Sequence, residues 1–211
     1  MCTRYCIELS PELRPYIDQA KAAPLTARMV AKLARPLKTE GEVRPTDIAP
    51  VLAPDSSRTP TVYPMVWGFT NPREGGKPLV NCRVETAGFK PFWKESWQRR
   101  RCIIPCSYYF EWEHYTTVKG EKKTGQKYMI QPTGAMLTYL AGLYDIEEKN
   151  GIKYPVFTVL TREPGEEISF IHNRMPVILG KEKVTSWLDP GTDPKDVVKT
   201  ALTDMYYEKV L

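Results

Sequence analysis

Nineteen prolines are spread along the 211 residues of this chain, and they do not gather in one linker. Because proline fixes φ and lacks an N–H donor, it ends strands, opens helices and interrupts long regular elements. The sequence therefore predicts short helices and strands joined by firm loops. It contains no internal repeat or low-complexity tract, and its length suits one domain better than two. We expect a single domain over residues 1–211.

β-branched and aromatic residues gather in five stretches between turn-forming residues, and these stretches predict strands. They are Val62–Trp67, Cys102–Trp112, Lys127–Gln131, Met136–Tyr144 and Lys153–Leu160. Asn150-Gly151, between the last two, is typical of a tight hairpin turn. Apolar spacing of three and four residues predicts helices over Pro11–Ala22, Leu25–Ala34, Pro91–Arg99, Pro164–Ile171, Lys183–Leu188 and Pro194–Leu202. This order predicts an α+β fold with a mainly antiparallel, barrel-like sheet flanked by short helices.

The five cysteines are expected to be reduced thiols, since an odd number cannot pair completely within one chain. The first residues are too polar for a signal peptide, and no apolar run is long enough to cross a bilayer. We expect a cytoplasmic protein, or a nuclear one if the source is eukaryotic. The net charge of +5 is compatible with binding a polyanion but does not require it.

Cys2 follows the initiator methionine, and a small residue there is the condition under which removal of Met1 normally exposes it. An N-terminal cysteine carries an amine and a thiol on adjacent carbons. The amine condenses with an aldehyde to an imine, and the thiol then closes a five-membered thiazolidine ring. An α-amine has a reference pKa of about 7.7–8.0, so much of it is nucleophilic at neutral pH. The plainer interpretation is an incidental terminal cysteine.

Two segments carry polar groups that suit such chemistry. Asn81 could orient an amine or a carbonyl, and Arg83 would share its face in an extended segment. Glu111 lies in the segment Tyr-Tyr-Phe-Glu-Trp-Glu, among four aromatic residues. We expect partial desolvation to raise the pKa of this carboxyl toward the range useful for proton transfer. The plainer interpretations are solvated side chains on a surface turn and on a half-buried strand.

His172 is one of two histidines, and it lies where a helix is expected to end before Pro176. A histidine in a loop can give or take a proton near pH 7. Arg174, two residues on, could hold a phosphate through two parallel hydrogen bonds. A capping histidine and a solvated arginine are the alternative interpretation.

In this order the segments resemble the SOS-response-associated peptidase (SRAP) domain. Each motif is short, but four in the right order, with cysteine at position 2, are specific. The resemblance runs from residue 2 to about residue 190. The matching pieces are Met1-Cys2, Asn81-Cys82-Arg83-Val84-Glu85-Thr86, Phe110-Glu111-Trp112 and His172-Asn173-Arg174-Met175-Pro176-Val177-Ile178-Leu179, supported by Trp67-Gly68-Phe69, Phe89-Lys90-Pro91 and Arg101-Cys102-Ile103-Ile104-Pro105.

The resemblance implies that the chain shields abasic sites in single-stranded DNA through a thiazolidine crosslink. Cys2 would supply the amine and the thiol to the ring-opened sugar aldehyde, and Asn81 would position the amine and the adduct. Glu111 and His172 would move protons during ring opening, imine formation and reversal. The peptidase label implies removal of Met1, and the chemistry on the sugar is lyase-like.

The resemblance also implies where DNA would lie. The implied partner is single-stranded DNA containing abasic sites, which makes the expected location nucleoid-associated. No metal, organic cofactor, membrane or obligatory protein partner is implied. The implied DNA contacts are phosphate contacts of Arg4, Arg83 and Arg174, Thr161 lining the same groove, and Pro45 and Trp67.

Two positions and two segments depart from the family pattern. Thr3 stands where glycine is usual, which alters backbone freedom beside Cys2. Glu42 stands where an asparagine is usual, and would place a carboxylate against DNA. The segment Asn71–Pro78 lacks the tryptophans that would stack on DNA, and Met205–Leu211 lacks the usual asparagine-rich tail.

Three other hypotheses fit parts of the sequence. A cysteine hydrolase would use Cys2 as nucleophile and His172 as base on peptide or amide bonds. A non-catalytic single-strand-binding module would use a basic run and two nearby tryptophans, and a zinc site would use cysteines with a histidine. The residues concerned are Arg99-Arg100-Arg101 with Trp93 and Trp97, and Cys102, Cys106 and His114 with Cys6 or Cys82.

Overall fold

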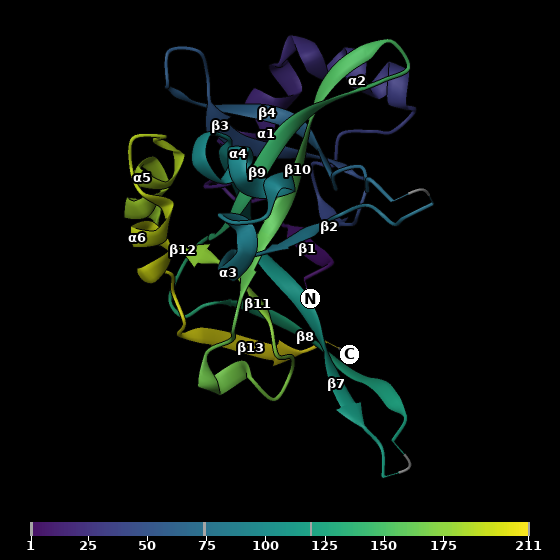
Figure 1. Ribbon diagram of the computed structural model, residues 1–211, viewed down its shortest axis with the longest axis vertical. Coiled ribbons are helices and arrows are strands. Elements are labelled where there is room, and N and C mark those ends of the chain that lie inside the picture. Colours follow the sequence, from purple (N-terminus) through teal and green to yellow (C-terminus); the bar gives the residue numbers. More distant parts are fainter. Residues whose placement is uncertain (1, 74, 119, 211) are drawn as a thin grey trace.

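Five long strands form the centre of the computed structural model, which describes residues 2–73, 75–118 and 120–210 (Figure 1). They are β3 (Ile48–Pro54), β4 (Pro60–Trp67), β6 (Arg101–Cys106), β9 (Thr138–Lys149) and β10 (Ile152–Arg162). Hydrogen bonding runs β10, β4, β3, β6, β9 and back to β10, so the strands close into a barrel. Only the pairing of β4 with β10 is parallel among these. The predicted α+β fold with a mainly antiparallel, barrel-like sheet is confirmed.

A second sheet continues from the barrel because one chain segment belongs to both. β6 passes through Ser107 into β7 (Tyr108–Thr116), which lies in the sheet β13-β8-β7-β1-β2. The strand predicted over Cys102–Trp112 is therefore two strands, since Ser107 donates its N–H to the Cys6 carbonyl and the chain changes sheet there. The other members are β1 (Arg4–Ile7), β2 (Gly41–Val43), β8 (Lys122–Pro132) and β13 (Met205–Lys209). The hairpin of β7 and β8 extends beyond the barrel (Figure 1).

Three short strands attach to the barrel where two of the polar motifs lie. β5 (Asn81–Arg83) runs parallel to β10, and β11 (Met175–Pro176) pairs antiparallel with β10. β12 (Ile178–Leu179) pairs with β9. Both polar segments, 81–83 and 172–176, are thereby held against the same end of β10.

Among the described residues there are six α-helices, and four of them have a proline in their first two positions, as the distribution of prolines predicts. In Figure 1, α1 and α2 lie at one end of the barrel, and α5 and α6 lie on one side of it. No helix within the described ranges is long and apolar enough to span a membrane. The helices are α1 (Arg14–Ala22), α2 (Pro24–Leu33), α3 (Val84–Ala87), α4 (Pro91–Arg99), α5 (Val184–Leu188) and α6 (Pro194–Lys199), with 3₁₀ turns η1 (Glu166–Ile168) and η2 (Lys181–Lys183).

The helix predicted over Pro164–Ile171 is wrong, because only the three residues of η1 are helical there. The Ile171 N–H bonds to the Ile168 carbonyl, and the Ile171 carbonyl accepts from the N–H of His114 on β7. The segment is thus tied to a strand instead of continuing its own helical hydrogen bonds. His172 consequently lies on a loop anchored to β7.

Asn150-Gly151 forms the tight hairpin turn that the sequence predicts. Asn150 and Gly151 have φ values of 53° and 73°, and Lys149 of β9 pairs directly with Ile152 of β10. Positive φ at both central residues gives the turn a twist that matches the strands it joins.

β3 was not expected, because its two prolines argue against a strand. Pro50 faces Pro64 across the pair with β4, so each proline sits opposite another residue that also lacks an N–H donor.

Candidate active site

Cys2 lies directly before β1 and is fully buried. The Asn81 side chain reaches it from the start of β5, where Asn81 Nδ2 donates to the Cys2 carbonyl at 2.8 Å. β5 is fixed in turn by its parallel pairing with β10, in which Asn81 lies opposite Val159. Asn81 Oδ1 is buried and has no hydrogen-bond partner among the described residues. An acceptor is therefore left beside the backbone of Cys2.

The Cys2 thiol is held in its neutral form. Burial, followed by the negative charge of Glu111, raises its pKa from 9.0 to about 12. Its Sγ donates weakly to the Arg4 carbonyl at 3.7 Å. Since a thiolate is the nucleophilic form, this thiol needs a neighbouring base at the moment it reacts.

Glu111 is only 3% exposed although it lies on a strand near the surface. Burial raises the pKa of its carboxyl, and the Trp112 N–H, which donates to Glu111 Oε1 at 3.3 Å, opposes part of that shift. The expectation of a desolvated carboxyl is confirmed. A raised pKa makes this carboxylate a stronger base than an ordinary one, which suits a group that takes and returns a proton.

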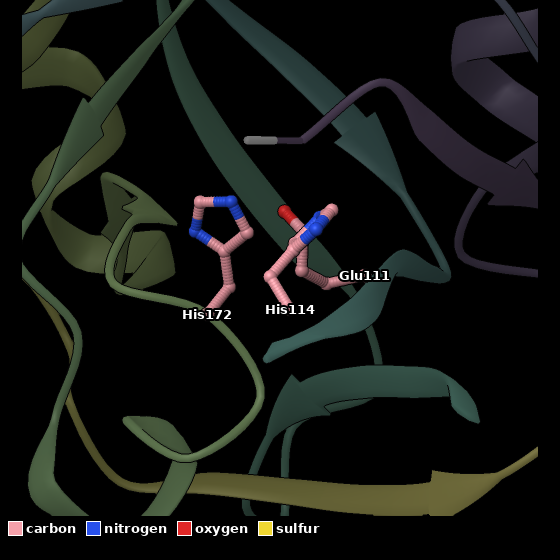
Figure 2. A group of neighbouring side chains, drawn as sticks. All are labelled: Glu111, His114 and His172. Carbon is pink, nitrogen blue, oxygen red and sulfur yellow. The ribbon is translucent and has the colours of Figure 1, made fainter. Parts of the chain in front are cut away.

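His114 joins this carboxyl where the pairing of β7 with β8 is irregular, since two steps along β7, from Trp112 to His114, match three steps along β8. In a regular strand, residues three apart point to opposite faces, so Glu111 and His114 would be separated. Beside this irregularity, a nitrogen of His114 lies within 4.8 Å of ligand atoms of Glu111 and His172. Figure 2 shows the three side chains converging from β7 and from the loop before β11. Sequence reasoning missed His114 as part of this site, since no pattern in the sequence marks a bulge.

His172 is oriented by the backbone of its own loop. The Arg174 N–H donates to His172 Nδ1 at 2.9 Å, so the neutral ring carries its proton on Nε2. Burial, with a contribution from His114, lowers the pKa of His172 from 6.5 to about 4. The two imidazole rings meet edge to face, with centroids 4.8 Å apart. At neutral pH, His172 is therefore a fixed Nε2–H donor to the cleft.

The same three side chains are the one group in the described part of the chain that could together hold a metal ion. A metal on His172 Nε2 would require that nitrogen to lose its proton and the bond from Arg174 to be given up. The set is thus better arranged for proton transfer than for metal binding. The alternative zinc site of Cys102, Cys106 and His114 is not formed. Both thiols point into the barrel core and are fully buried, whereas His114 lies on the exposed hairpin.

An open cleft of about 520 Å³ lies over this group. Arg83 lies on its rim, is exposed and forms no ion pair with any residue the structure describes. Its guanidinium is therefore available to an anion that enters the cleft. The lining residues are Thr3, Arg83, Glu111, Trp112, His114, Thr124, His172, Asn173 and Arg174.

Arg174 serves a different purpose from the expected phosphate contact in this arrangement. Its guanidinium is largely buried and makes two parallel hydrogen bonds of 2.8 Å to Glu85, and a third of 2.6 Å to the Thr161 carbonyl. These bonds tie the His172 loop to α3 and β10. Arg174 therefore holds the histidine in place from beneath the cleft.

The sequence profile of the family described as SOS response associated peptidase (SRAP) matches residues 1–210 of this chain. The chain belongs to the SRAP family. The match includes every residue of the cleft, so the cysteine, asparagine, glutamate and histidine motifs all fall within it. The resemblance inferred from the motifs is confirmed.

Curated relatives of this SRAP protein carry names that refer to abasic sites. Abasic site processing protein YoaM of Bacillus subtilis is 32% identical over 142 residues, or 64% of this chain and 60% of that protein. Abasic site processing protein HMCES of Xenopus tropicalis is 32% identical over 135 residues, or 56% of this chain and 40% of that protein. The aligned region thus spans less than two thirds of either relative.

Solved structures share the fold of this SRAP protein. A protein from Bacteroides thetaiotaomicron superposes with a TM-score of 0.71 at 19% identity, covering 100% of this chain and 92% of that one. A phage-related protein from Bordetella bronchiseptica gives a TM-score of 0.70 at 22% identity, covering 99% and 94%. At these identities the likeness concerns the fold alone.

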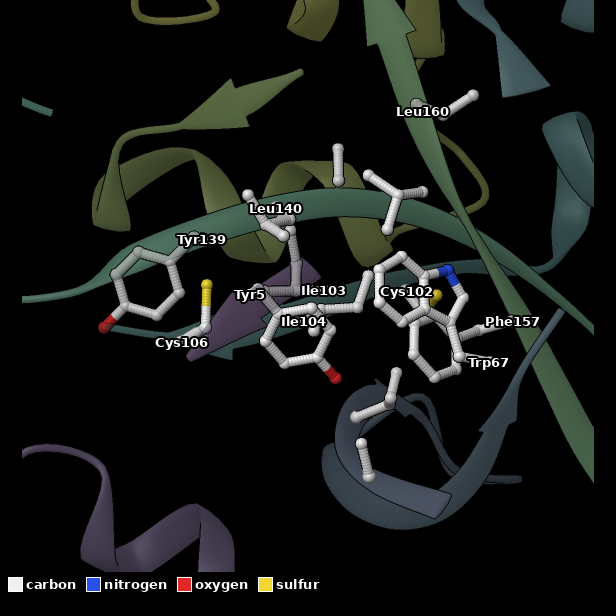
Figure 3. Packing of buried hydrophobic residues seen from close by; sticks show 14 of the residues in the cluster. Tyr5, Trp67, Cys102, Ile103, Ile104, Cys106, Tyr139, Leu140, Phe157 and Leu160 are labelled. Carbon is white, nitrogen blue, oxygen red and sulfur yellow. The ribbon is translucent and has the colours of Figure 1, made fainter. Parts of the chain in front are cut away.

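Two expected DNA contacts of the SRAP protein lie inside the barrel. Trp67 is fully buried, stacks on Phe157 at 6.0 Å between ring centroids and donates from Nε1 to the Val80 carbonyl (Figure 3). Thr161 is also fully buried and donates to the Cys82 carbonyl at 3.4 Å. Because their polar atoms are directed at the backbone, the expectation that these side chains face DNA is wrong. Pro45, half-buried in the turn between β2 and β3, does not line the cleft.

The basic run of the alternative single-strand-binding module is structural in this SRAP protein. Arg101 is 2% exposed and donates to carbonyls at the ends of α4 and α5. Arg100 pairs with Glu95 and Asp145. The two tryptophans expected to stack on bases, Trp93 and Trp97, are buried. A binding module built on this run is excluded, because its cations and rings are already used in packing.

Proposed function

We propose that this SRAP protein captures abasic sites in single-stranded DNA by a covalent thiazolidine bond to Cys2, after Met1 has been removed. The observation that carries the proposal is the position of Cys2. Its backbone is held by Asn81, and its thiol is close enough to Glu111 for that charge to raise the thiol pKa. Family membership and the abasic-site names of the relatives support the same chemistry.

The proposed reaction needs no cofactor to balance. The Cys2 amine adds to the aldehyde carbon of the ring-opened sugar, and loss of one water gives an imine. The thiol sulfur then adds to the same carbon, and its proton ends on the nitrogen. Asn81 Oδ1, an acceptor without a described partner beside Cys2, is suited to bind the amine and orient its lone pair.

Glu111 and His172 have complementary roles in this proposal. The Glu111 carboxylate accepts the thiol proton, because its raised pKa makes it a stronger base than an ordinary carboxylate. His172 donates from Nε2 to the sugar oxygen or the departing water, since its Nδ1 already accepts from Arg174. A neutral imidazole that acts as a donor needs no titration of its own.

Arg83 at the rim is the cation best placed to meet a DNA phosphate, and Trp112 and Thr3 offer neighbouring contacts. A protein that works in this way is associated with DNA in the cell. A hydrolase acting in trans, with Cys2 as nucleophile, is the alternative, and its product distinguishes it: a hydrolase turns over its substrate, whereas capture ends in a covalent complex.

The proposal is tested by incubating the protein with an oligonucleotide that carries one abasic site. We expect a band that survives denaturation, with the mass of the protein lacking Met1 plus the DNA minus one water. Cys2→Ala and a form that retains Met1 should give no such band. A protein with a confirmed N-terminal Cys2 that yields no adduct would contradict the proposal.

Replacing His114 by alanine should slow the capture reaction by about tenfold. We assign it the transfer of protons between the cleft and solvent, because it is the exposed member of the group with Glu111 and His172. The bond that anchors the 172 loop comes from the backbone N–H of His114, so the loop contact survives the substitution. Initial rates on denaturing gels measure the effect. Added imidazole should restore the capture rate of the His114→Ala variant. If imidazole does not restore the rate, His114 has a purely structural role.

A further inference from the structure

Glu42 on β2 is surrounded by cations. Its carboxylate accepts from Lys127 Nζ at 2.5 Å and from Arg44 Nη2 at 3.0 Å, and it lies 3.8 Å from Arg4 Nε. The hydrogen bond from Lys127 lowers the pKa of Glu42, so the carboxylate stays ionised. Three positive charges thus gather around one negative charge on a partly exposed surface. We call these four residues the Glu42 cluster.

The Glu42 cluster lies on the face of the second sheet opposite to Glu111. Directly paired residues share a face, and β1 pairs Arg4 with Phe110 of β7. Lys127 pairs with Trp112, and its Nζ lies 3.7 Å from the Phe110 ring centroid and 5.5 Å from that of Trp112. Trp112 also lines the cleft. Trp112 is therefore the residue that connects the two, since it lines the cleft and lies beside Lys127 of the cluster.

We propose that the Glu42 cluster binds a phosphate of the DNA strand beyond the cleft, and that Glu42 takes the place of this phosphate in the free protein. The inference rests on the proposed function, which brings a strand into the cleft. A phosphate and a carboxylate present the same kind of oxygen acceptors to Lys and Arg. A strand that reaches this face must displace the Glu42 carboxylate from Lys127 and Arg44 before it gains their charges. Glu42 thereby weakens binding of intact strands while leaving the reaction within the cleft unaffected.

The proposal is tested with Glu42→Gln, which removes the charge and keeps the shape. Binding is measured by fluorescence anisotropy over a salt series, using Cys2→Ala protein and an oligothymidine that is longer than the cleft and lacks abasic sites. We expect Glu42→Gln to tighten binding by about three- to tenfold, since it uncovers cations already aligned. The slope of log affinity against log salt should steepen by about 0.7, the value for one added phosphate contact on a single strand.

Glu40→Gln is the matched control, because Glu40 is an exposed acid two residues away and forms no ion pair within the described residues. It should change binding less than twofold. In a Lys127→Gln background the gain from Glu42→Gln should shrink, because the principal cation that Glu42 covers is missing. Equal effects of Glu42→Gln and Glu40→Gln would overturn the proposal, since net charge alone would then account for them.

A second substrate separates this inference from the proposed function. The rate of covalent capture of an abasic trinucleotide, which occupies the cleft alone, should be the same in wild type and Glu42→Gln. Absence of any adduct with wild type would refute the capture reaction, and the anisotropy series would still decide the role of Glu42. A faster capture of the trinucleotide by Glu42→Gln would overturn the inference, because Glu42 would then act within the cleft.

Discussion

Glu111→Gln is expected to slow covalent capture of an abasic site by about a hundredfold, within the range that a positioned acid or base contributes. Glutamine keeps the size and the bond from the Trp112 N–H, but it cannot take the thiol proton. The Cys2 thiol, with a pKa of about 12, then has to react in its neutral form. We expect the imine to form and ring closure to become the slow step.

The pH dependence of this reaction has a defined sign. Burial raises the pKa of Glu111, and capture requires the carboxylate, so the wild-type rate should fall as pH drops through that raised pKa. The rate of the Glu111→Gln variant should not show this fall at low pH. Both proteins should keep the rise that follows deprotonation of the Cys2 amine at about pH 8.

Single-turnover rates with an abasic oligonucleotide measure both effects, and borohydride trapping reports imine that has not closed. Glu113→Gln is the matched control, since Glu113 lies on the same strand and accepts from the Tyr128 hydroxyl at 2.7 Å. It should alter the rate by less than threefold. If Glu111→Gln closes the ring as fast as wild type, another group accepts the thiol proton.

Arg101→Met is expected to lower the free energy of unfolding by about 4 kcal/mol, the cost of removing a buried hydrogen-bonded charge. Arg101 donates to the carbonyls of Trp187, Gln98 and Trp97 at 2.6, 2.9 and 3.1 Å. It also bonds to the carbonyls of Asp189 and Thr192. These carbonyls lie at or beyond the ends of α4 and α5, so one side chain caps both helices. Methionine fills much of the volume and leaves the carbonyls unpaired.

Urea unfolding followed by circular dichroism measures this loss. Arg99→Met is the control, because Arg99 is exposed and has no hydrogen bond or ion pair among the described residues. It should change stability by less than about 0.5 kcal/mol. The loss of free energy of unfolding in Arg101→Lys should lie between those of Arg99→Met and Arg101→Met. A lysine can reach some of the carbonyls but lacks the planar guanidinium group. Equal midpoints for Arg99→Met and Arg101→Met would show that the carbonyls find other donors.

Local patterns in the sequence predicted the elements that depend on local chemistry. The turn at Asn150-Gly151, the helices opened by prolines, and the α+β class all follow from preferences of neighbouring residues. Strands β1 and β2 were not predicted, because each has only three or four residues and is stabilised by partners far along the chain. β13 was missed for a related reason, since its pairing with β8 joins segments about seventy residues apart.

The sequence alone was enough to identify the family and the order of its motifs, and to predict Cys2 as the reactive group, because the chemistry of an N-terminal cysteine depends on covalent structure. Only the tertiary structure decided which side chains share the cleft. His114 meets Glu111 beside an irregularity in the pairing of β7 with β8, and the pairing with Glu85 directs Arg174 inward. Barrel closure buries Trp67, which a linear motif cannot distinguish from a surface tryptophan. Which face a residue presents is set by strand register and by contacts between distant segments, and neither is encoded in any short stretch of sequence.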